Sequence, residues 1–75
     1  MSANNENSSF EMNGSLKHIY DAIIETGDDP VKQLSGYILS EDPTYIPETN
    51  GARKEMRKLD RDDILAELIL NYFKA

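Results

Sequence analysis

The chain of 75 residues contains no cysteine and only one histidine, His18. Without cysteine it can form neither disulfides nor thiolate zinc sites, and it has no cysteine nucleophile. A single histidine cannot build a histidine-rich metal centre. No apolar run approaches the roughly eighteen residues of a membrane-spanning helix, and residues 1–10 lack the basic and apolar regions of a secretory signal. We therefore expect a cytoplasmic protein without membrane insertion, metal or cofactor.

The length of the chain allows one small domain. A domain of about sixty ordered residues buries only about 60% of the surface that its unfolded chain exposes, so its core is small. With neither a disulfide nor a metal to reinforce that core, the chain needs very regular helix packing or a second copy of itself. The size therefore predicts a homodimer.

Charge is distributed unevenly along the chain, whose net charge is −6. Residues 1–50 hold two basic and nine acidic side chains, whereas residues 51–75 hold six basic and five acidic ones. Nucleic-acid binding needs positive charge to displace counterions, so the acidic balance argues against it. Five of the six bases in the second part lie between Arg53 and Arg61, which makes this stretch the main candidate for a binding surface.

The first residues are rich in Asn and Ser and offer too little apolar surface to offset the entropy of ordering them. We therefore expect a flexible N-terminal segment over residues 1–14 and a single helical domain over residues 15–75. Phe10 and Met12 are apolar enough to dock the end of this segment on the core. The accessible hydroxyls of the segment, which are the candidates for phosphorylation, are Ser2, Ser8 and Ser9.

Two amphipathic helices are predicted in the first half of the domain. Ser15 is the expected N-cap of the first helix, and Gly27 is its expected C-cap. Its apolar face consists of Leu16, Ile19, Tyr20, Ile23 and Ile24. Asp29 and Pro30 are typical of the start of the second helix, whose apolar residues are Val31, Leu34, Ile38 and Leu39. Gly36 lies within that helix, where alanine would be more stable by roughly 1 kcal/mol. It suggests close approach by another element, the alternative being a glycine that is tolerated there without cause.

Residues 40–50 are predicted to form an extended loop or a set of turns, because Pro43 and Pro47 each disfavour helix at the preceding residue. The apolar anchors of this loop are Tyr45 and Ile46. Asn50 and Gly51 are typical of a turn. Beyond it the chain should form two more helices, so the predicted fold is all-α, a small bundle of about four helices.

The third helix is predicted over residues 52–59, with a basic face that includes Arg53 and Arg57. Asp60 and Asp63 are expected at the start of the last helix, where carboxylates favour the positive end of the helix dipole. The last helix carries the widest apolar stripe of the chain, namely Ile64, Leu65, Leu68, Ile69, Tyr72 and Phe73. We expect this stripe to form the centre of the core and, in part, a dimer face.

Catalysis is the least favoured function, because a nucleophile needs a positioned base and the chain offers no such set. His18 is interpreted as a partly exposed structural histidine beside the apolar stripe of the first helix. The aspartates at positions 60, 62 and 63 resemble part of a calcium loop, but they lack its glycine and its bidentate glutamate. Helix capping accounts for them, so no catalytic residue and no metal site are predicted.

The basic stretch is predicted to be a partner-binding surface made of Arg53, Lys54, Arg57, Lys58 and Arg61. Arginine binds carboxylate or phosphate in a bidentate manner, so an acidic partner or the protein's own phosphorylated N-terminal segment would suit this surface. A solvated helix face, paired in part with neighbouring acids, is the alternative. Two rival functions are a structural scaffold dimer that is never modified and a helix–turn–helix DNA reader, the latter disfavoured by the acidic start of the last helix.

The order and spacing of several motifs between residues 28 and 73 resemble the IreB/ReoM family of small regulatory phosphoproteins from Gram-positive bacteria. The matching motifs are Asp29-Pro30-Val31, Gln33, Gly36-Tyr37-Ile38-Leu39-Ser40, Asp42-Pro43, Tyr45-Ile46-Pro47, Ala52-Arg53, Arg57-Lys58, Arg61-Asp62 and Glu67-Leu68. The resemblance implies an all-helical homodimer without enzymatic activity. It also implies a substrate of a transmembrane Ser/Thr kinase with extracellular PASTA repeats.

The same resemblance implies a link from that kinase to peptidoglycan synthesis and to tolerance of cell-wall antibiotics such as cephalosporins. In some members the unphosphorylated form promotes proteolysis, by a Clp protease, of the enzyme that commits precursor to the wall. The implied partners are therefore a second copy, a Ser/Thr protein kinase, a Clp protease and a cell-wall precursor enzyme. Nucleic acid is not among them.

Three features depart from the family pattern. Asn7 stands where the family has its phosphorylated threonine, with Ser8 and Ser9 beside it. The segment between residues 12 and 30 is shorter than in the family by about two helical turns. Glu48 replaces a basic residue, so one member of the arginine surface is reversed in charge.

Overall fold

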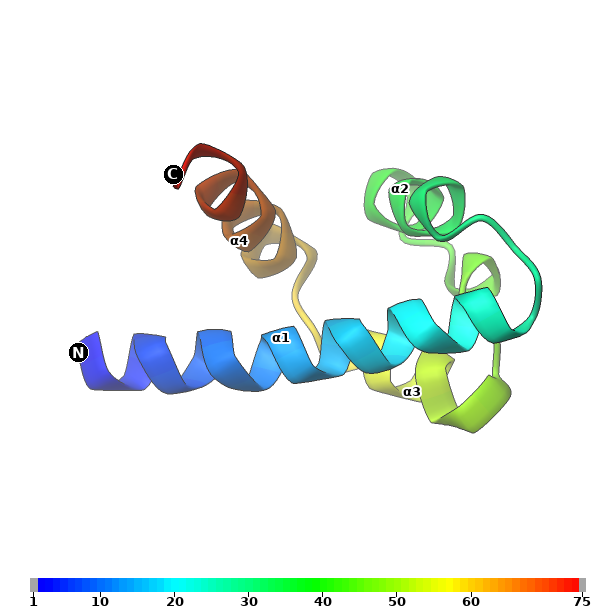
Figure 1. The fold of residues 1–75 in the computed structure, drawn as a ribbon, viewed down its shortest axis with the longest axis horizontal. Helices are drawn as coiled ribbons and strands as arrows, with labels where there is room; N and C mark the ends of the chain where they lie inside the picture. Colours follow the sequence, from blue (N-terminus) through cyan, green and yellow to red (C-terminus); the bar gives the residue numbers. More distant parts are fainter. Residues whose placement is uncertain (1, 75) are drawn as a thin grey trace.

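The computed structural model describes the backbone of residues 2–74 and the side chains of residues 11–74. This part of the chain is all-helical and contains no strand, so the predicted all-α class is confirmed. Its elements are α1 (Ser2–Glu25), α2 (Pro30–Ser40), η1 (Pro43–Tyr45), η2 (Thr49–Gly51), α3 (Ala52–Arg57) and α4 (Arg61–Phe73). Figure 1 shows α1 as the long axis of the molecule, with α2 and α4 on one side of it. The short helix α3 packs along α1.

Local signals in the sequence account for three of the helix ends. The Asp29 side chain caps α2 by accepting from the amide of Val31 at 3.0 Å, and the Asp60 side chain caps α4 by accepting from the amide of Asp62 at 2.9 Å. Gly27 has a φ of 87°, the left-handed conformation that ends a helix most easily in glycine. The predicted caps at these three positions are therefore confirmed.

The predicted start of the first helix at Ser15 is wrong. Helix α1 begins at Ser2, and the Ser15 hydroxyl donates to Glu55 Oε2 at 2.5 Å instead of capping α1. The apolar stripe continues one turn further than expected, because Met12 packs against the core four residues before Leu16. The expected docking of Met12 is confirmed, whereas the Phe10 side chain lies outside the described residues. The flexibility of residues 1–14, and with it the division of the chain at that point, stays a prediction.

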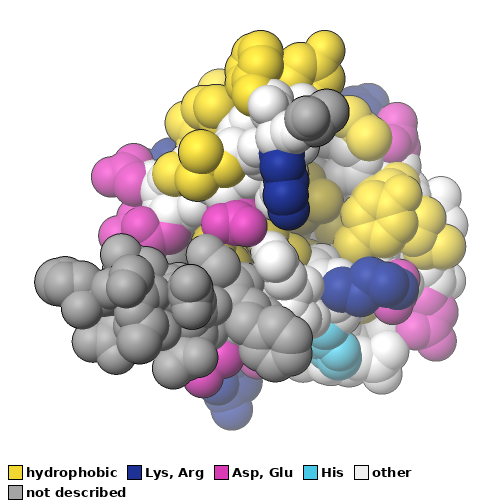
Figure 2. Space-filling model, turned by 60° about the vertical axis from the view of Figure 1, so that its left-hand side comes forward, with side chains coloured by type: hydrophobic (Ala, Val, Ile, Leu, Met, Phe, Trp, Pro, Cys, Tyr) yellow, Lys and Arg dark blue, Asp and Glu magenta, His cyan; other side chains and the backbone are white. Residues whose placement is uncertain are grey.

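The core is centred on α1 and its contacts with α3 and the loop, not on α4 as predicted. Its buried residues are Ile19, Ala22, Ile23, Tyr37, Ile46, Ala52, Met56 and Ile64. Only Ile64 represents α4 among them. Figure 2 shows hydrophobic side chains across the top of the molecule, the side on which Figure 1 places α2 and α4. The remaining apolar stripe of α4 is exposed because the described chain provides no layer to cover it; its members are Leu65, Leu68, Ile69, Tyr72 and Phe73.

The loop between α2 and α3 closes on α2 through Tyr45. A Cβ atom at Gly36 would lie 2.6 Å from Tyr45 Cδ1, which is closer than any side chain tolerates. The prediction that another element approaches Gly36 is therefore confirmed, and the element is the loop. Gln33 Nε2 donates to the Tyr45 carbonyl at 2.9 Å, and Ile46 is fully buried, so this loop is attached to the core at several points.

Two polar residues shape the ends of the same loop. The Asp42 side chain caps η1, and hydrogen bonds from the Thr44 hydroxyl and then the Thr44 amide hold the pKa of Asp42 below its ordinary value. Asn50 and Gly51 have φ values of 53° and 74°, which confirms the predicted turn before α3. These contacts fix the conformation of the loop and thereby the direction in which α3 packs along α1.

Candidate functional site

Part of the basic stretch forms an open depression on the molecular surface at the start of α3. Its volume is about 500 Å3, and its lining residues are Glu48, Gly51, Arg53, Lys54 and Arg57. Arg53 and Arg57 share this surface because they lie one helical turn apart in α3. We call these five residues the basic depression. It brings together three of the five bases that the sequence predicted as a binding surface.

Arg53 has a structural task within the basic depression. Its Nε donates to the Ile46 carbonyl at 2.8 Å, and its Nη1 lies 2.9 Å from Glu48 Oε2. The guanidinium therefore ties the loop to α3, and Glu48 offsets part of its charge. The ion pair of Glu48 with Arg53 could have been found from the charge of Glu48 and its position five residues before Arg53. The bond from Arg53 to the Ile46 carbonyl has no signal in the sequence.

Lys54 and Arg57 are the open cations of the basic depression. Both side chains are exposed, and neither has an ion pair with any residue whose side chain the structure describes. The guanidinium of Arg57 can present its donors to a carboxylate or phosphate as a planar fork, whereas Lys54 acts as a point charge. These two residues are thus best placed to bind an acidic group from another molecule.

Lys58 and Arg61 point elsewhere, so the five predicted bases do not form one surface. Lys58 lies 4.0 Å from Glu55 and faces the space between α1 and α4. Arg61 Nη1 donates to the Ile38 carbonyl at 2.8 Å, and its Nη2 lies 3.2 Å from Glu41. The reason is that α3 ends at Arg57 and α4 begins at Arg61, so the helical spacing that relates the bases is broken between them.

Arg61 therefore fastens α4 to the end of α2. The Ile38 carbonyl is among the last four of α2, which have no partner within their own helix, so a guanidinium satisfies it well. Since Ile64 is the only buried side chain of α4, the bond from Arg61 to the Ile38 carbonyl is a substantial part of what holds α4 to the rest of the fold.

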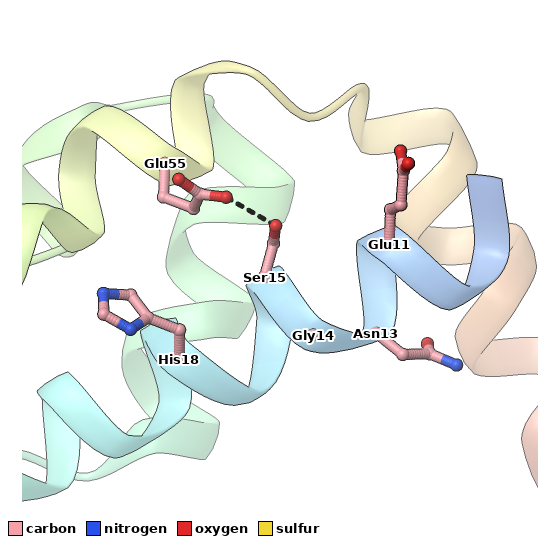
Figure 3. A pocket seen from close by; sticks show the side chains of 6 residues that line it. All are labelled: Glu11, Asn13, Gly14, Ser15, His18 and Glu55. Carbon is pink, nitrogen blue, oxygen red and sulfur yellow. Dashed lines mark hydrogen bonds between the residues drawn. The ribbon is translucent and has the colours of Figure 1, made fainter. Parts of the chain in front are cut away.

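A second hollow lies beside the contact between α1 and α3 and contains Ser15, His18 and Glu55. Figure 3 shows the Ser15 hydroxyl directed at Glu55, with His18 on the next turn of α1. His18 Nε2 lies 2.7 Å from the Asn50 carbonyl, and His18 is exposed. The serine and the histidine are therefore each bonded to α3 or its preceding turn, which is the arrangement of a structural contact and not of a nucleophile with its base.

The remaining sequence-predicted residues have these positions. Ser2, Ser8 and Ser9, the phosphorylation candidates, belong to α1, but their side chains lie outside the described residues. Asp60 is the N-cap of α4, and Asp62 and Asp63 occupy its first turn, as the capping interpretation predicted.

Among residues 11–74, no three histidine, cysteine or acidic side chains are placed to hold a metal ion. Within the described chain, no helix has the length and apolar character needed to cross a membrane.

The fold and the basic depression define a small all-helical protein whose open cations are suited to an acidic partner. A family model described as IreB regulatory phosphoprotein matches residues 1–74. The chain therefore belongs to the IreB family of regulatory phosphoproteins, and the family resemblance seen in its motifs is confirmed over nearly the whole length. A regulatory role follows from this membership.

Proposed function

We propose that this protein is a non-enzymatic cytosolic adaptor that is switched by phosphorylation and acts on cell-wall synthesis. Membership of the IreB family over residues 1–74 is the observation that carries the proposal. The proposed kinase is a transmembrane Ser/Thr kinase with PASTA repeats, and the proposed output is control of peptidoglycan synthesis and cephalosporin tolerance. A Clp protease and the enzyme that commits precursor to the wall are the proposed partners.

The basic depression is the proposed contact with the target. Lys54 and Arg57 supply the open positive charge, and Arg53 holds the loop that shapes the site. Phosphate on Ser2, Ser8 or Ser9 would add up to about two negative charges to the N-terminal segment. The phosphate would either pair with the basic depression or repel an acidic target, and both effects lower the affinity for that target.

The proposed switch is tested by incubating the full-length protein with ATP and the kinase domain of its own host. Mass spectrometry then locates any added phosphate. We expect modification of Ser8 or Ser9, because they directly follow Asn7, where the family has its threonine. Substituting both serines by alanine should abolish the modification. A protein that takes up no phosphate at any position would contradict the switch and leave an adaptor or scaffold that works independently of the kinase.

We also propose that the protein is a homodimer that buries the exposed stripe of α4. Leu65, Leu68 and Ile69 are each about half exposed, at 47%, 47% and 50%, although they share one face of the helix. Large apolar patches on soluble proteins usually mark an interaction site, and the eight buried residues among residues 11–74 make a small core for independent stability. Sedimentation equilibrium at micromolar concentration should return twice the mass of the chain. A monomer mass throughout would contradict the proposal.

A further inference from the structure

A groove lies between residues 11–15 of α1 and α4. Its volume is about 710 Å3, and the turn after α3 contributes to its lining. Figure 2 shows acidic side chains below the hydrophobic top of the molecule. The apolar residues of the groove are Met12, Leu59, Ala66 and Leu70. Met12 and Leu59 pack against the core, so the groove has a supported apolar floor.

The charge around this floor is strongly one-sided. Among the described side chains, five carboxylates line the groove, against a single base, Lys58. Glu55 is already bonded to Ser15 and paired with Lys58, and Asp60 is used as the N-cap of α4. Glu11 and Asp63, by contrast, have no hydrogen bond or ion pair with any residue in the described part of the chain. An incoming positive charge would therefore find two uncommitted carboxylates, one on each wall.

The groove does not coincide with the proposed dimer face. Asp63, Ala66 and Leu70 recur at intervals of three and four residues, so they share one flank of α4. Leu65 and Leu68 of the dimer face lie on another flank of the same helix, because Leu65 is two residues, about 200°, from Asp63, and Leu68 is two residues from Ala66 and from Leu70. A partner could occupy the groove while the apolar stripe of α4 is buried elsewhere.

We propose that this groove binds a basic amphipathic helix from another protein. A helix whose apolar residues recur at intervals of three and four would cover the floor formed by Met12, Leu59 and Leu70. Lysines or arginines flanking that stripe would face Glu11 and Asp63, so the charges of the two surfaces are complementary. An acidic helix would meet like charge on both walls. The inference goes beyond the proposed function, because it adds a second partner whose charge is opposite to that of the target at the basic depression.

The test uses the full-length protein and a synthetic helical peptide of about eighteen leucine and lysine residues, arranged to give one apolar face. A second peptide, with glutamate in place of every lysine, controls for apolar attraction alone. NMR titration of the protein with the lysine peptide should show saturable shifts that centre on Met12, Leu59, Ala66 and Leu70. The glutamate peptide should produce no such shifts.

Two charge reversals in α4 provide the matched comparison. Asp63→Lys removes a carboxylate of the groove, whereas Asp62→Lys makes the same change in the same first turn of α4 but outside the groove. Both variants lose the same favourable interaction with the helix dipole. We expect Asp63→Lys to weaken peptide binding at least about tenfold and Asp62→Lys to change it less than about twofold, a difference of roughly 1 kcal/mol. Glu11→Lys, on the opposite wall, should reproduce the loss if Asp63→Lys proves unstable.

Several results would overturn the inference. Equal weakening by Asp62→Lys and Asp63→Lys would show attraction to the net charge and no site. Shifts centred on Leu65 and Ile69 would place the peptide on the dimer face. Loss of self-association in Asp63→Lys would assign the groove to bases of a second copy. None of these results depends on phosphorylation, so failure of the kinase experiment would leave the groove proposal standing.

Discussion

Replacement of Ile23 by alanine is expected to lower the free energy of unfolding by about 2–5 kcal/mol, the range for truncation of a buried isoleucine. Ile23 is fully buried at the centre of the core formed by α1, α3 and the loop. Small domains are stable by only about 5–15 kcal/mol, so the variant should unfold at a much lower urea concentration or be unfolded in buffer. Urea denaturation followed by circular dichroism measures the difference.

Ile24→Ala is the matched control for this prediction. Ile24 is the next residue of α1 and has the same side chain, but half of that side chain is exposed to solvent, at 50%. Its truncation should cost less than about 1 kcal/mol, because little apolar contact is lost. Equal effects at the two positions, or a small effect of Ile23→Ala, would contradict the placement of the core on α1.

Three of the helix ends were predictable from the sequence because they depend on neighbouring residues. Asp29 and Asp60 cap helices through bonds to amides two residues ahead, and Gly27 ends α1 through its own backbone conformation. Such interactions need no knowledge of the remaining chain. A glycine within a helix indicated that another element approaches Gly36. The approaching residue, Tyr45, lies in the loop beyond the helix, so it could not be identified from local spacing.

The position of the core was not predictable in the same way. The stripe on α4 is wider than that on α1, yet Ile64 is its only buried member. Periodicity shows which face of a helix is apolar, but it does not show which other element covers that face. In α1 the covering elements are Ile46 of the loop and α3, and α3 reaches the helix only after the turn at Asn50 and Gly51.

The sequence predicted only part of the candidate site, because helical spacing relates residues only within one helix. Arg53 and Arg57 lie in one continuous helix, so their spacing correctly placed them on one surface. Arg61 has the same spacing from Arg57, but the helix ends between the two residues, and Arg61 instead bonds the Ile38 carbonyl at the end of α2. A spacing rule holds only within one element.

Arg57→Glu is expected to weaken binding of the proposed target, the host enzyme that commits precursor to the cell wall, at least about tenfold, equivalent to about 1.4 kcal/mol. Arg57 is an open cation of the basic depression, and its reversal replaces attraction to an acidic partner by repulsion. Since Arg57 is exposed and has no ion pair among the described residues, the free energy of unfolding should change by less than about 0.5 kcal/mol. Biolayer interferometry and urea denaturation of the same preparation measure the two quantities.

Lys58→Glu is the control for net charge, because it makes the same change at the adjacent residue but outside the basic depression. It should change the affinity by less than about threefold, or under 1 kcal/mol. Equal losses in the Lys58 and Arg57 variants would mean that the enzyme responds to overall charge and would contradict a defined contact. Unchanged binding by Arg57→Glu would contradict the basic depression itself.

Arg61→Glu tests whether Arg61 supports the fold, in contrast to Arg57, which is proposed to bind the target. The substitution removes the bond to the Ile38 carbonyl and brings a carboxylate towards Glu41, so it should loosen α4 and lower the free energy of unfolding by about 1–3 kcal/mol. Any loss of binding in this variant should therefore accompany a loss of stability, whereas Arg57→Glu should lose binding alone. If Arg61→Glu stayed as stable as the parent and still lost binding, Arg61 would belong to the contact surface, and its role in fastening α4 would be wrong.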